Sequence, residues 1–425
     1  MHKHDQIMHL YRFKGYDINS ITRLIQTAVV LGKSKQSLLK TIFEVLYVCF
    51  VKRVHYSYKK TLKEKAILCF GVDVKKRKDL RPLFDNVISS ITDKHVIYEE
   101  DALVITMNNA FNNLLCVFIW LIQLRKSDLI YSRKLILIRK LIEVLHLKRF
   151  VEKNKNITDN TIALLVFNDS LPSGNFIVQY FKKRNIKTAT LQHGIVLSPR
   201  VGMNNVDFAG LELQNSNSDY FLAWNEFTRK EALKAGMDAE KIKVLGISRC
   251  IDLEDRIINN QDANVFGVVL DGEFTKDNNS VLIEFAKEIA RRLEMKFIVR
   301  FHPRMNVHLY DELLVNDNSL LEISDKNEDI YQYMEKVKFS LIANSTVYIE
   351  MIFMHHVVYK YNSLMDKYET VKWGAFSNIE ELLNKVNSRE NNISEKNLLY
   401  HELITIPNIK ESYTNFFNNF YGFSE

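Results

Sequence analysis

The sequence is poor in cysteine, proline and glycine, with four, five and 13 copies among 425 residues. The four cysteines, Cys49, Cys69, Cys116 and Cys250, lie far apart, and no two of them form a paired spacing. This distribution argues against a disulfide framework and against a thiolate metal site. A reducing compartment is the simpler interpretation, and the first residues lack the apolar segment of a secretory signal. We therefore expect a cytoplasmic protein.

Long apolar runs are also missing. The longest, Leu114 to Leu124, is too short to cross a bilayer as a helix, so we expect no membrane span. This run continues into a basic, amphipathic stretch, and residues 111–150 could therefore rest as two helices on an anionic membrane surface. The simpler interpretation is an ordinary helix pair with a solvated basic side.

Several common motifs are absent. No GxGxxG, Walker A, HExxH or CxxC pattern occurs, which removes the usual signals of dinucleotide redox chemistry, P-loop hydrolysis and zinc catalysis. The net charge of +7 fits an anionic partner, such as nucleic acid, acidic lipid, a nucleotide or a charged polymer. Because the basic residues cluster in amphipathic helices without interleaved exposed aromatic residues, we expect no nucleic-acid binding.

The composition is that of a folded protein, with 47% apolar, 11% aromatic and 26% charged residues. Helical spacing of apolar residues and a basic character predict a helical N-terminal extension over residues 1–60. From Ala66 onward, short apolar runs alternate with helical segments, which indicates parallel βαβ units. The expected strands are 66–70, 162–167, 188–191, 220–223, 242–245, 265–270, 297–299, 339–342 and 357–359.

A polar segment from Asp252 to Asp262 separates two series of such units. We therefore predict an α/β protein with two tandem Rossmann-like, doubly wound domains, a helical N-terminal extension and a C-terminal helix. The predicted division is the extension (1–60), a first domain (61–258), a second domain (259–395) and a helical tail (396–425).

The first candidate site lies where the strand 188–191 runs into Gln192, His193 and Gly194. Ligands of open parallel sheets bind at the carboxyl ends of strands, so polar residues there deserve weight. His193 is either a surface turn histidine or a general base or phosphate contact. Asp169 follows another strand of the same domain, where it could orient His193 or act as the base itself.

The second candidate site follows the strand 297–299, which leads into Arg300, His302, Pro303 and Arg304. Two arginines and a histidine at a strand end suit an anion that must be held and charge-compensated as it leaves. The alternative is a basic turn that is satisfied by neighbouring carbonyls.

The third candidate site follows the strand 339–342, at Asn344, Ser345 and Thr346. Amide and hydroxyl groups at a strand-to-helix junction can seat a phosphate without a glycine-rich loop. Glu350, one helical turn further on, could accept hydrogen bonds from ribose hydroxyls. A simple helix N-cap would have the same pattern. Together the three sites predict a cleft between two nucleotide-binding domains, with the donor held by the second domain and the acceptor activated by the first.

Four segments carry a family resemblance: "LQHGIVLSP", "SDYFLAWNEFTRKEALKAGMDAEKIKVLGISR", "FIVRFHPR" and "SLIANSTVYIEMIF". In this order they resemble GT-B-fold glycosyltransferases of bacterial surface polysaccharide synthesis, both polysialyltransferase-like capsule enzymes and CDP-glycerol glycerophosphotransferase-like enzymes. The resemblance covers roughly Thr161 to Tyr361. It implies that the second domain binds a nucleotide-sugar donor and that the first binds the acceptor.

On the donor side, the resemblance implies that His302 and Pro303 form the family's His-Pro pair, whose histidine contacts the donor phosphate. It likewise implies that Ser345 and Thr346 bind this phosphate and that Glu350 lies near the ribose.

On the acceptor side, His193 and Gly194 match the His-Gly of the glycerophosphotransferases, in which the histidine is a proposed base. The sequence departs from the polysialyltransferases, which have an acidic pair before a glycine in the N-terminal half. Here only Asp169, followed by Ser170, stands in that region, which argues against sialic acid specificity.

The sequence and the resemblance together predict an inverting glycosyltransferase with no cofactor beyond the nucleotide-activated donor itself. We expect no metal, because no aspartate pair of the kind that holds Mg²⁺ is evident. The expected acceptor is a capsule, teichoic acid or lipid-linked glycan at the inner face of the plasma membrane. Two alternatives stay open: transfer of a polyol phosphate from a CDP-polyol, and a non-catalytic GT-B-like subunit that binds a glycan or a partner.

Overall fold

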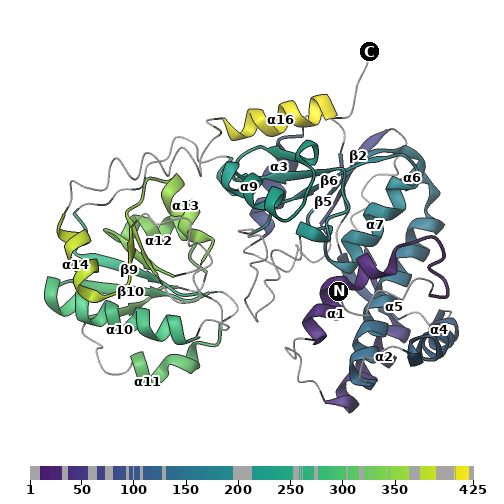
Figure 1. Ribbon diagram of the computed structural model, residues 1–425, viewed down its shortest axis with the longest axis horizontal. Helices are drawn as coiled ribbons and strands as arrows, with labels where there is room; N and C mark the ends of the chain where they lie inside the picture. Colours follow the sequence, from purple (N-terminus) through teal and green to yellow (C-terminus); the bar gives the residue numbers. More distant parts are fainter. Residues whose placement is uncertain are drawn as a thin grey trace. The chain divides into compact units, whose positions relative to one another are not determined.

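The computed structural model describes residues 10–30, 37–55, 65–71, 80–91, 95–98, 100–105, 109–126, 131–194, 213–251, 258, 260, 262–271, 276–302, 305–314, 320–325, 327–343, 345–362, 374–388, 406 and 408–420. The chain folds into two compact units, each built around a sheet (Figure 1). Unit 1 comprises Met1–Trp224, Thr228–Arg249 and Asn408–Glu425, and unit 2 comprises Asn225–Phe227 and Cys250–Pro407.

The sheet of unit 1 has six parallel strands in the order β3-β2-β5-β6-β7-β8. Their bounds are β2 Ala66–Phe70, β3 His95–Tyr98, β5 Thr161–Val166, β6 Lys187–Leu191, β7 Tyr220–Ala223 and β8 Ile242–Val244. The inner strands are buried along almost their whole length, as expected for a parallel sheet covered on both faces. The strand order reverses between β2 and β5, which is the position where doubly wound sheets bind ligands.

The helices of unit 1 are α1 Ile18–Val30, α2 Leu38–Phe50, α3 Arg81–Ser89, α4 Ala110–Gln123, α5 Tyr131–Lys153, α6 Lys155–Asn160, α7 Pro172–Lys182 and, from Thr228 onward, α9 Glu226–Lys234. A short antiparallel pair, β1 Val51–His55 with β4 Glu100–Ile105, adjoins them. One hydrophobic core joins residues of α1, α2, α4, α5 and α7 to residues of β2 and β5. The N-terminal helices therefore pack into the core of the first Rossmann-like unit.

The last helix, α16 Ile409–Phe420, returns to unit 1 after the chain has built unit 2. The hydroxyl of Tyr413 donates to the Gly246 carbonyl at 3.2 Å, and that of Thr414 donates to the Ser90 carbonyl at 3.0 Å. Gly246 has a φ of +98°, and a Cβ there would lie 2.8 Å from a side-chain carbon of Ile409. The position therefore needs glycine both for its backbone conformation and for the close approach of α16.

Unit 2 has a second parallel sheet of six strands, in the order β11-β10-β9-β12-β13-β14. Its strands are β9 Val265–Val269, β10 Lys296–Arg300, β11 Leu321–Ile323, β12 Ser340–Ile342, β13 Val358–Tyr361 and β14 Ala375–Phe376. Its helices are α10 Lys276–Leu293, α11 Asp311–Leu314, α12 Ile330–Lys336, α13 Val347–Phe353 and α14 Ile379–Asn387. Numbered within the unit, the strand order is 3-2-1-4-5-6, with the reversal between β9 and β12.

The predicted fold class is confirmed, since the chain contains two Rossmann-like α/β units and a C-terminal helix. The predicted four-part division of the chain stays a prediction. Within the described residues, no helix has the combination of length and apolar character that a bilayer span requires.

Candidate functional site

His193 lies just beyond the carboxyl end of β6, in a cavity of about 40 Å³. The residues that follow β5 and β6 line the cavity, together with Leu213, Ser216 and Phe221. The imidazole is partly exposed and packs against the ring of Phe167, with 5.4 Å between the ring centroids. A cavity of this size admits a single small group, such as a hydroxyl, beside the imidazole.

Asn168 sets the orientation of the His193 ring. Its Nδ2 lies 3.3 Å from Nε2 of His193, while its Oδ1 accepts hydrogen bonds from the backbone N–H and the hydroxyl of Ser170. Because Oδ1 is held by two donors, the amide NH₂ must face the imidazole, and an amide NH₂ can only donate. In this arrangement Nε2 accepts from the Asn168 amide, which fixes the orientation of the imidazole ring at the cavity.

Asp169 is buried and holds a loop in place. Its Oδ2 accepts hydrogen bonds from the Ser216 hydroxyl and from the backbone N–H groups of Asn217 and Ser218, at 2.8 to 2.9 Å. Burial raises the pKa of this carboxyl, and the hydrogen bonds oppose the rise. The contact to the His193 ring comes from Asn168, and the carboxylate of Asp169 fixes the segment that precedes β7.

Gln192, which the sequence placed on the acceptor side, is buried and engaged within the protein. Its Oε1 accepts from the Trp224 N–H at 2.7 Å, and its Nε2 donates to the Gly194 carbonyl and to the Thr228 hydroxyl. These bonds tie the end of β6 to the end of β7 and to α9. At Gly194, in contrast, a Cβ would meet no atom within 4 Å. Gly194 therefore faces open space beside His193.

A second, larger pocket of about 430 Å³ in unit 1 shares Leu213, Ser216 and Phe221 with the His193 cavity. Arg23 and Lys241 supply two cationic groups to its lining. Pockets of 300 to 1,000 Å³ are typical of small-molecule sites. No sequence pattern indicated this pocket, because α1 and the turn before β8 are far apart along the chain.

In unit 2, Ser345 and Thr346 follow β12, at the reversal of strand order between β9 and β12. The hydroxyl of Ser345 accepts from the Val347 N–H at 3.4 Å, and the Thr346 side chain makes no capping bond to α13. Ser345 therefore caps the first turn of α13, as the N-cap alternative expected, whereas the Thr346 side chain takes no part in the cap. Glu350 lies one turn further along α13 and is buried.

Arg300, at the carboxyl end of β10, is half-buried and engaged with the loop after β11. Its NH1 donates to the Ser324 hydroxyl at 3.3 Å, and its NH2 donates to the Glu328 carbonyl at 2.7 Å. Two of its five N–H donors are thus used within the protein, as the basic-turn alternative expected. Burial lowers the pKa of the guanidinium, while the negative charges of Glu328, Asp329 and Glu350 raise it.

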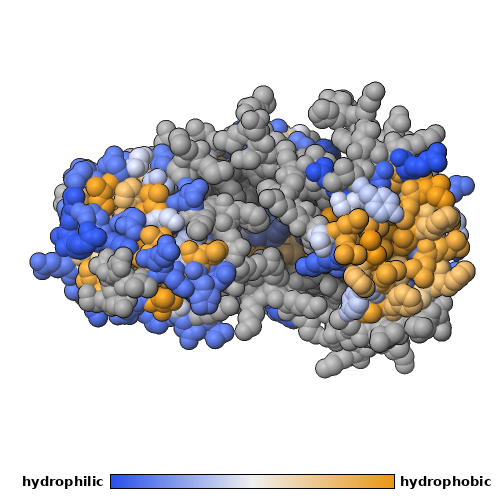
Figure 2. All heavy atoms as spheres, turned by 90° about the horizontal axis from the view of Figure 1, so that it is seen from below, coloured by the Kyte–Doolittle hydropathy of each residue, from blue (hydrophilic) through white to orange (hydrophobic). Residues whose placement is uncertain are grey.

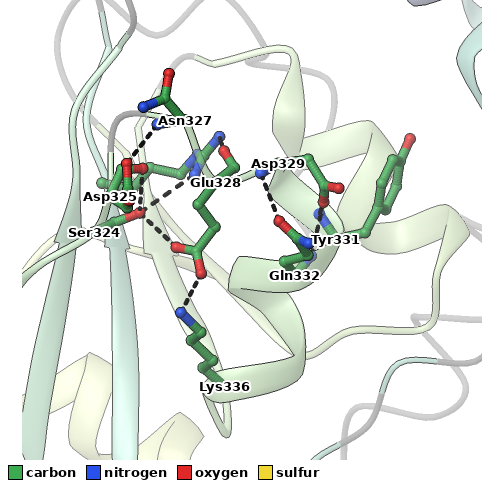
Figure 3. Close-up of polar contacts among 9 residues, drawn as sticks. Ser324, Asp325, Asn327, Glu328, Asp329, Tyr331, Gln332 and Lys336 are labelled. Atoms are coloured by element: carbon green, nitrogen blue, oxygen red, sulfur yellow. Dashed lines mark hydrogen bonds and ion pairs between the residues drawn. The ribbon is translucent and has the colours of Figure 1, made fainter.

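The loop that receives Arg300 is held by its own polar contacts (Figure 3). The Ser324 hydroxyl donates to the Glu328 carboxylate at 2.7 Å, and Glu328 also forms an ion pair with Lys336. Asp329 begins α12 with a capping box, in which Gln332 is the reciprocal partner. The loop after β11 is therefore a preorganised support for the guanidinium.

His302 lies two residues beyond β10, and its carbonyl accepts from the Met305 N–H at 2.8 Å, which closes a turn. Pro303, Arg304 and Asn344, which complete the predicted donor side, lie outside the described residues. Among the residues that are described, no group of three or more His, Cys, Asp or Glu side chains could hold a metal ion.

We compared the chain with known proteins and with solved structures. No family model and no curated protein matches the sequence. Among solved structures, UDP-GlcNAc 2-epimerase from Neisseria meningitidis bound to UDP-GlcNAc has a TM-score of 0.51 at 12% identity, over 84% of this chain and 99% of that one. The S. aureus MnaA-UDP co-structure has a TM-score of 0.52 at 11% identity, over 84% and 96%. The chain has the GT-B fold.

Another similar structure, a putative UDP-N-acetylglucosamine 2-epimerase from Listeria monocytogenes, has a TM-score of 0.52 at 12% identity, over 83% of this chain and 94% of that one. Structural similarity at 11 to 12% identity shows the fold alone, which is the GT-B architecture of two Rossmann-like domains. Function must be argued from the residues of this chain.

Sequence reasoning missed Asn168 as the partner of His193. The signal was the polar run Asn168-Asp169-Ser170 directly after an apolar strand. Only the adjacency of β5 and β6 brings the first member of that run to the imidazole.

Proposed function

We propose that this GT-B protein is a glycosyltransferase that moves a sugar from a nucleotide-activated donor to a bacterial surface glycan with inversion at the anomeric carbon. The capsule, teichoic acid and lipid-linked oligosaccharides are the acceptors that the sequence resemblance favours. The protein would act at the inner face of the plasma membrane. The proposal invokes no metal, because the sequence offers no aspartate pair between strands.

One observation carries the proposal: the arrangement of Asn168 and His193 in a small cavity at the carboxyl end of the sheet of unit 1. The Asn168 amide holds the His193 ring in position at the cavity, and the adjacent Gly194 faces open space. This combination suits a general base that receives an acceptor hydroxyl.

The proposed reaction is a single displacement. The imidazole of His193 removes the proton from the acceptor hydroxyl as the oxygen attacks the anomeric carbon of the donor sugar. The bond from that carbon to the phosphate oxygen breaks, and the nucleotide leaves with the bonding electron pair. The imidazolium then returns its proton to water.

Unit 2 would hold the donor. The hydroxyls of Ser345 and Thr346 lie at its strand-order reversal, where nucleotides bind in doubly wound sheets. His302 would contact the departing phosphate, and the charge of Arg300 would lower the free energy of the anion that develops on it. Glu350 would accept from the ribose hydroxyls. Pro303, Arg304 and Asn344 stay predictions on the same side.

The pocket of about 430 Å³ beside the His193 cavity is a candidate for the acceptor. Its volume suits one or two sugar rings, and Arg23 and Lys241 suit a phosphate or carboxylate on the acceptor.

The test starts with thermal-shift screening of the full chain against CMP-, CDP-, UDP- and GDP-linked donors. Turnover of the donor that binds is then compared between the wild type, His193→Ala and His193→Gln. Because general base catalysis contributes roughly 10²- to 10⁴-fold, both variants should lower kcat within that range and keep the Kd of the donor. An equal loss of donor binding and turnover would contradict the base assignment.

The products separate the alternatives. Transfer of a polyol phosphate from a CDP-polyol releases CMP and moves donor phosphorus into the product, whereas sugar transfer moves no phosphorus from the donor. Epimerisation of the donor without an acceptor would indicate an activity like that named for the similar solved structures. Binding of none of the four nucleotide classes would favour a non-catalytic subunit.

A further inference from the structure

Helix α4 exposes a stripe of large apolar side chains. Phe111, Leu115, Phe118 and Ile122 follow helical spacing and are all exposed, and the exposed fractions of the two phenylalanines are 78% and 62%. The helix contains no charged residue. A surface helix normally presents polar side chains to water, so this stripe requires an explanation.

Helix α2 adds a second stripe. Leu39 and Phe43 are 70% and 69% exposed, and Leu46 and Tyr47 are exposed as well. Helix α2 packs against α4, and we call the two exposed stripes together the α2/α4 face. Figure 2 shows apolar side chains gathered over one area of the unit that carries these helices.

Helix α5 packs against α2 and α4, and most of its apolar side chains are not exposed. Its apolar side chains, including Leu135, Ile138, Leu141 and Leu145, are buried in the core of unit 1. The sequence allowed two interpretations of these residues, a membrane-facing basic helix and an ordinary helix pair with a solvated basic side. The structure shows α5 as a core helix, and the exposed apolar residues belong to α2 and α4.

The charges around the α2/α4 face are mainly positive. From Ala110 to Ile142 the sequence has six basic residues and one acidic residue, Asp128. Lys40 and Arg125 are exposed next to the two stripes, and the one acidic group of α2, Glu44, is ion-paired with Arg139. Exposed aromatic and aliphatic residues beside Lys and Arg are typical of helices that lie in an anionic lipid interface.

We propose that the α2/α4 face docks on an anionic lipid membrane, with the apolar stripes inserted at the level of the headgroups and acyl chains. The positive charge argues against a second copy of the chain as the occupant, because a two-fold interface would place the same cations against each other. Anionic headgroups instead complement these cations. The docking is independent of the reaction at His193.

The test is co-sedimentation of the full chain with vesicles, without any donor or acceptor. One set contains phosphatidylcholine alone, and the other contains phosphatidylcholine with 30% phosphatidylglycerol. We expect binding to the anionic vesicles and at least tenfold weaker binding to the neutral ones. Raising the salt to 1 M should weaken the binding without abolishing it, because the apolar contribution is not screened.

Two variants locate the contact. Phe111→Asn with Phe118→Asn should reduce binding to anionic vesicles at least tenfold and leave the melting temperature unchanged, because both side chains are exposed. Val281→Asn, at an exposed apolar position of α10 in unit 2, is the matched control and should bind like the wild type.

The proposal is overturned if the wild type binds neither kind of vesicle or if the double variant binds as tightly as the wild type. A wild-type dimer in analytical ultracentrifugation that the double variant converts to a monomer, without vesicle binding by either, would assign the face to a second copy. Because no substrate is present, none of these outcomes depends on the proposed transferase activity.

Discussion

Asn168 is the residue whose chemistry bears most directly on the proposed base. A carboxylate at this position would stabilise the imidazolium form of His193 more than the amide that stands there. We expect Asn168→Asp to move the acidic limb of the pH profile of kcat/KM to higher pH by about one unit. The profile of Asn168→Ala, which adds no charge, is the control. An unchanged limb in Asn168→Asp would remove Asn168 from its positioning role.

The four cysteines are free and buried. Burial raises the pKa of the Cys49 thiol to about 12 and also raises the pKa values of Cys69 and Cys116. Because the thiolate is the reactive species, labelling by a disulfide reagent at pH 8 should be at least about a hundredfold slower in the native protein than in urea. Rapid labelling of the native protein at any of these three positions, located by peptide mapping, would contradict the burial.

The first turn of helix α7 packs closely against the loop that follows β5. A Cβ at Gly174, in its first turn, would lie 1.9 Å from the Asn168 carbonyl oxygen. Gly174→Ala must therefore displace Asn168, and we expect a loss of roughly 1–3 kcal/mol of stability, together with reduced turnover. Urea unfolding measures the first effect. Gly194→Ala, where a Cβ would meet no atom, should keep wild-type stability.

The loop before β7 depends on Asp169, which accepts three hydrogen bonds from it. Asp169→Ala leaves two buried N–H groups and a hydroxyl without this acceptor, which should cost about 1–3 kcal/mol. Asp169→Asn retains an acceptor oxygen and should recover at least half of the loss in urea unfolding. Equal stability of the alanine variant and the wild type would show that the loop does not need the carboxylate.

The elements that the sequence predicted best are the buried parallel strands. β7 and β9 are short apolar runs bounded by polar residues, and the structure places them at 220–223 and 265–269. β11 escaped prediction because it is three residues long and contains Glu322. The pairing of β1 with β4 joins segments about fifty residues apart. A single sequence does not show which distant segments pair.

For the candidate site, too, the sequence predicted positions along the chain but not the contacts between distant segments. The strand-end rule placed His193, Ser345 and Arg300 correctly with respect to the sheets, because parallel strands end at a common edge. The rule could not predict which residues form hydrogen bonds with these side chains. The loop contacts of Arg300 and the amide beside His193 arise from strand adjacency, which is a property of the folded sheet.

At the scale of the whole molecule, unit 1 is assembled from segments at both ends of the chain. The return of α16 covers Gly246, Ser90 and Tyr220, whose ring meets that of Phe416 edge-on at 5.9 Å. We expect Tyr413→Ala to destabilise unit 1 by about 3–5 kcal/mol and to leave unit 2 unchanged. Hydrogen exchange with mass spectrometry separates the two units. Asn415→Ala, on the exposed side of α16, is the control.

The return of α16 also sets an order of events during synthesis. Protein domains generally fold as units while the ribosome is still translating, beginning with the most N-terminal one. Here unit 1 cannot be completed until α16 has been translated, which happens only after all of unit 2. A nascent chain that stalls inside the second unit therefore leaves the seat of α16 uncovered. The surface that α16 normally covers, which includes Gly246 and Tyr220, would then be exposed to chaperones and proteases.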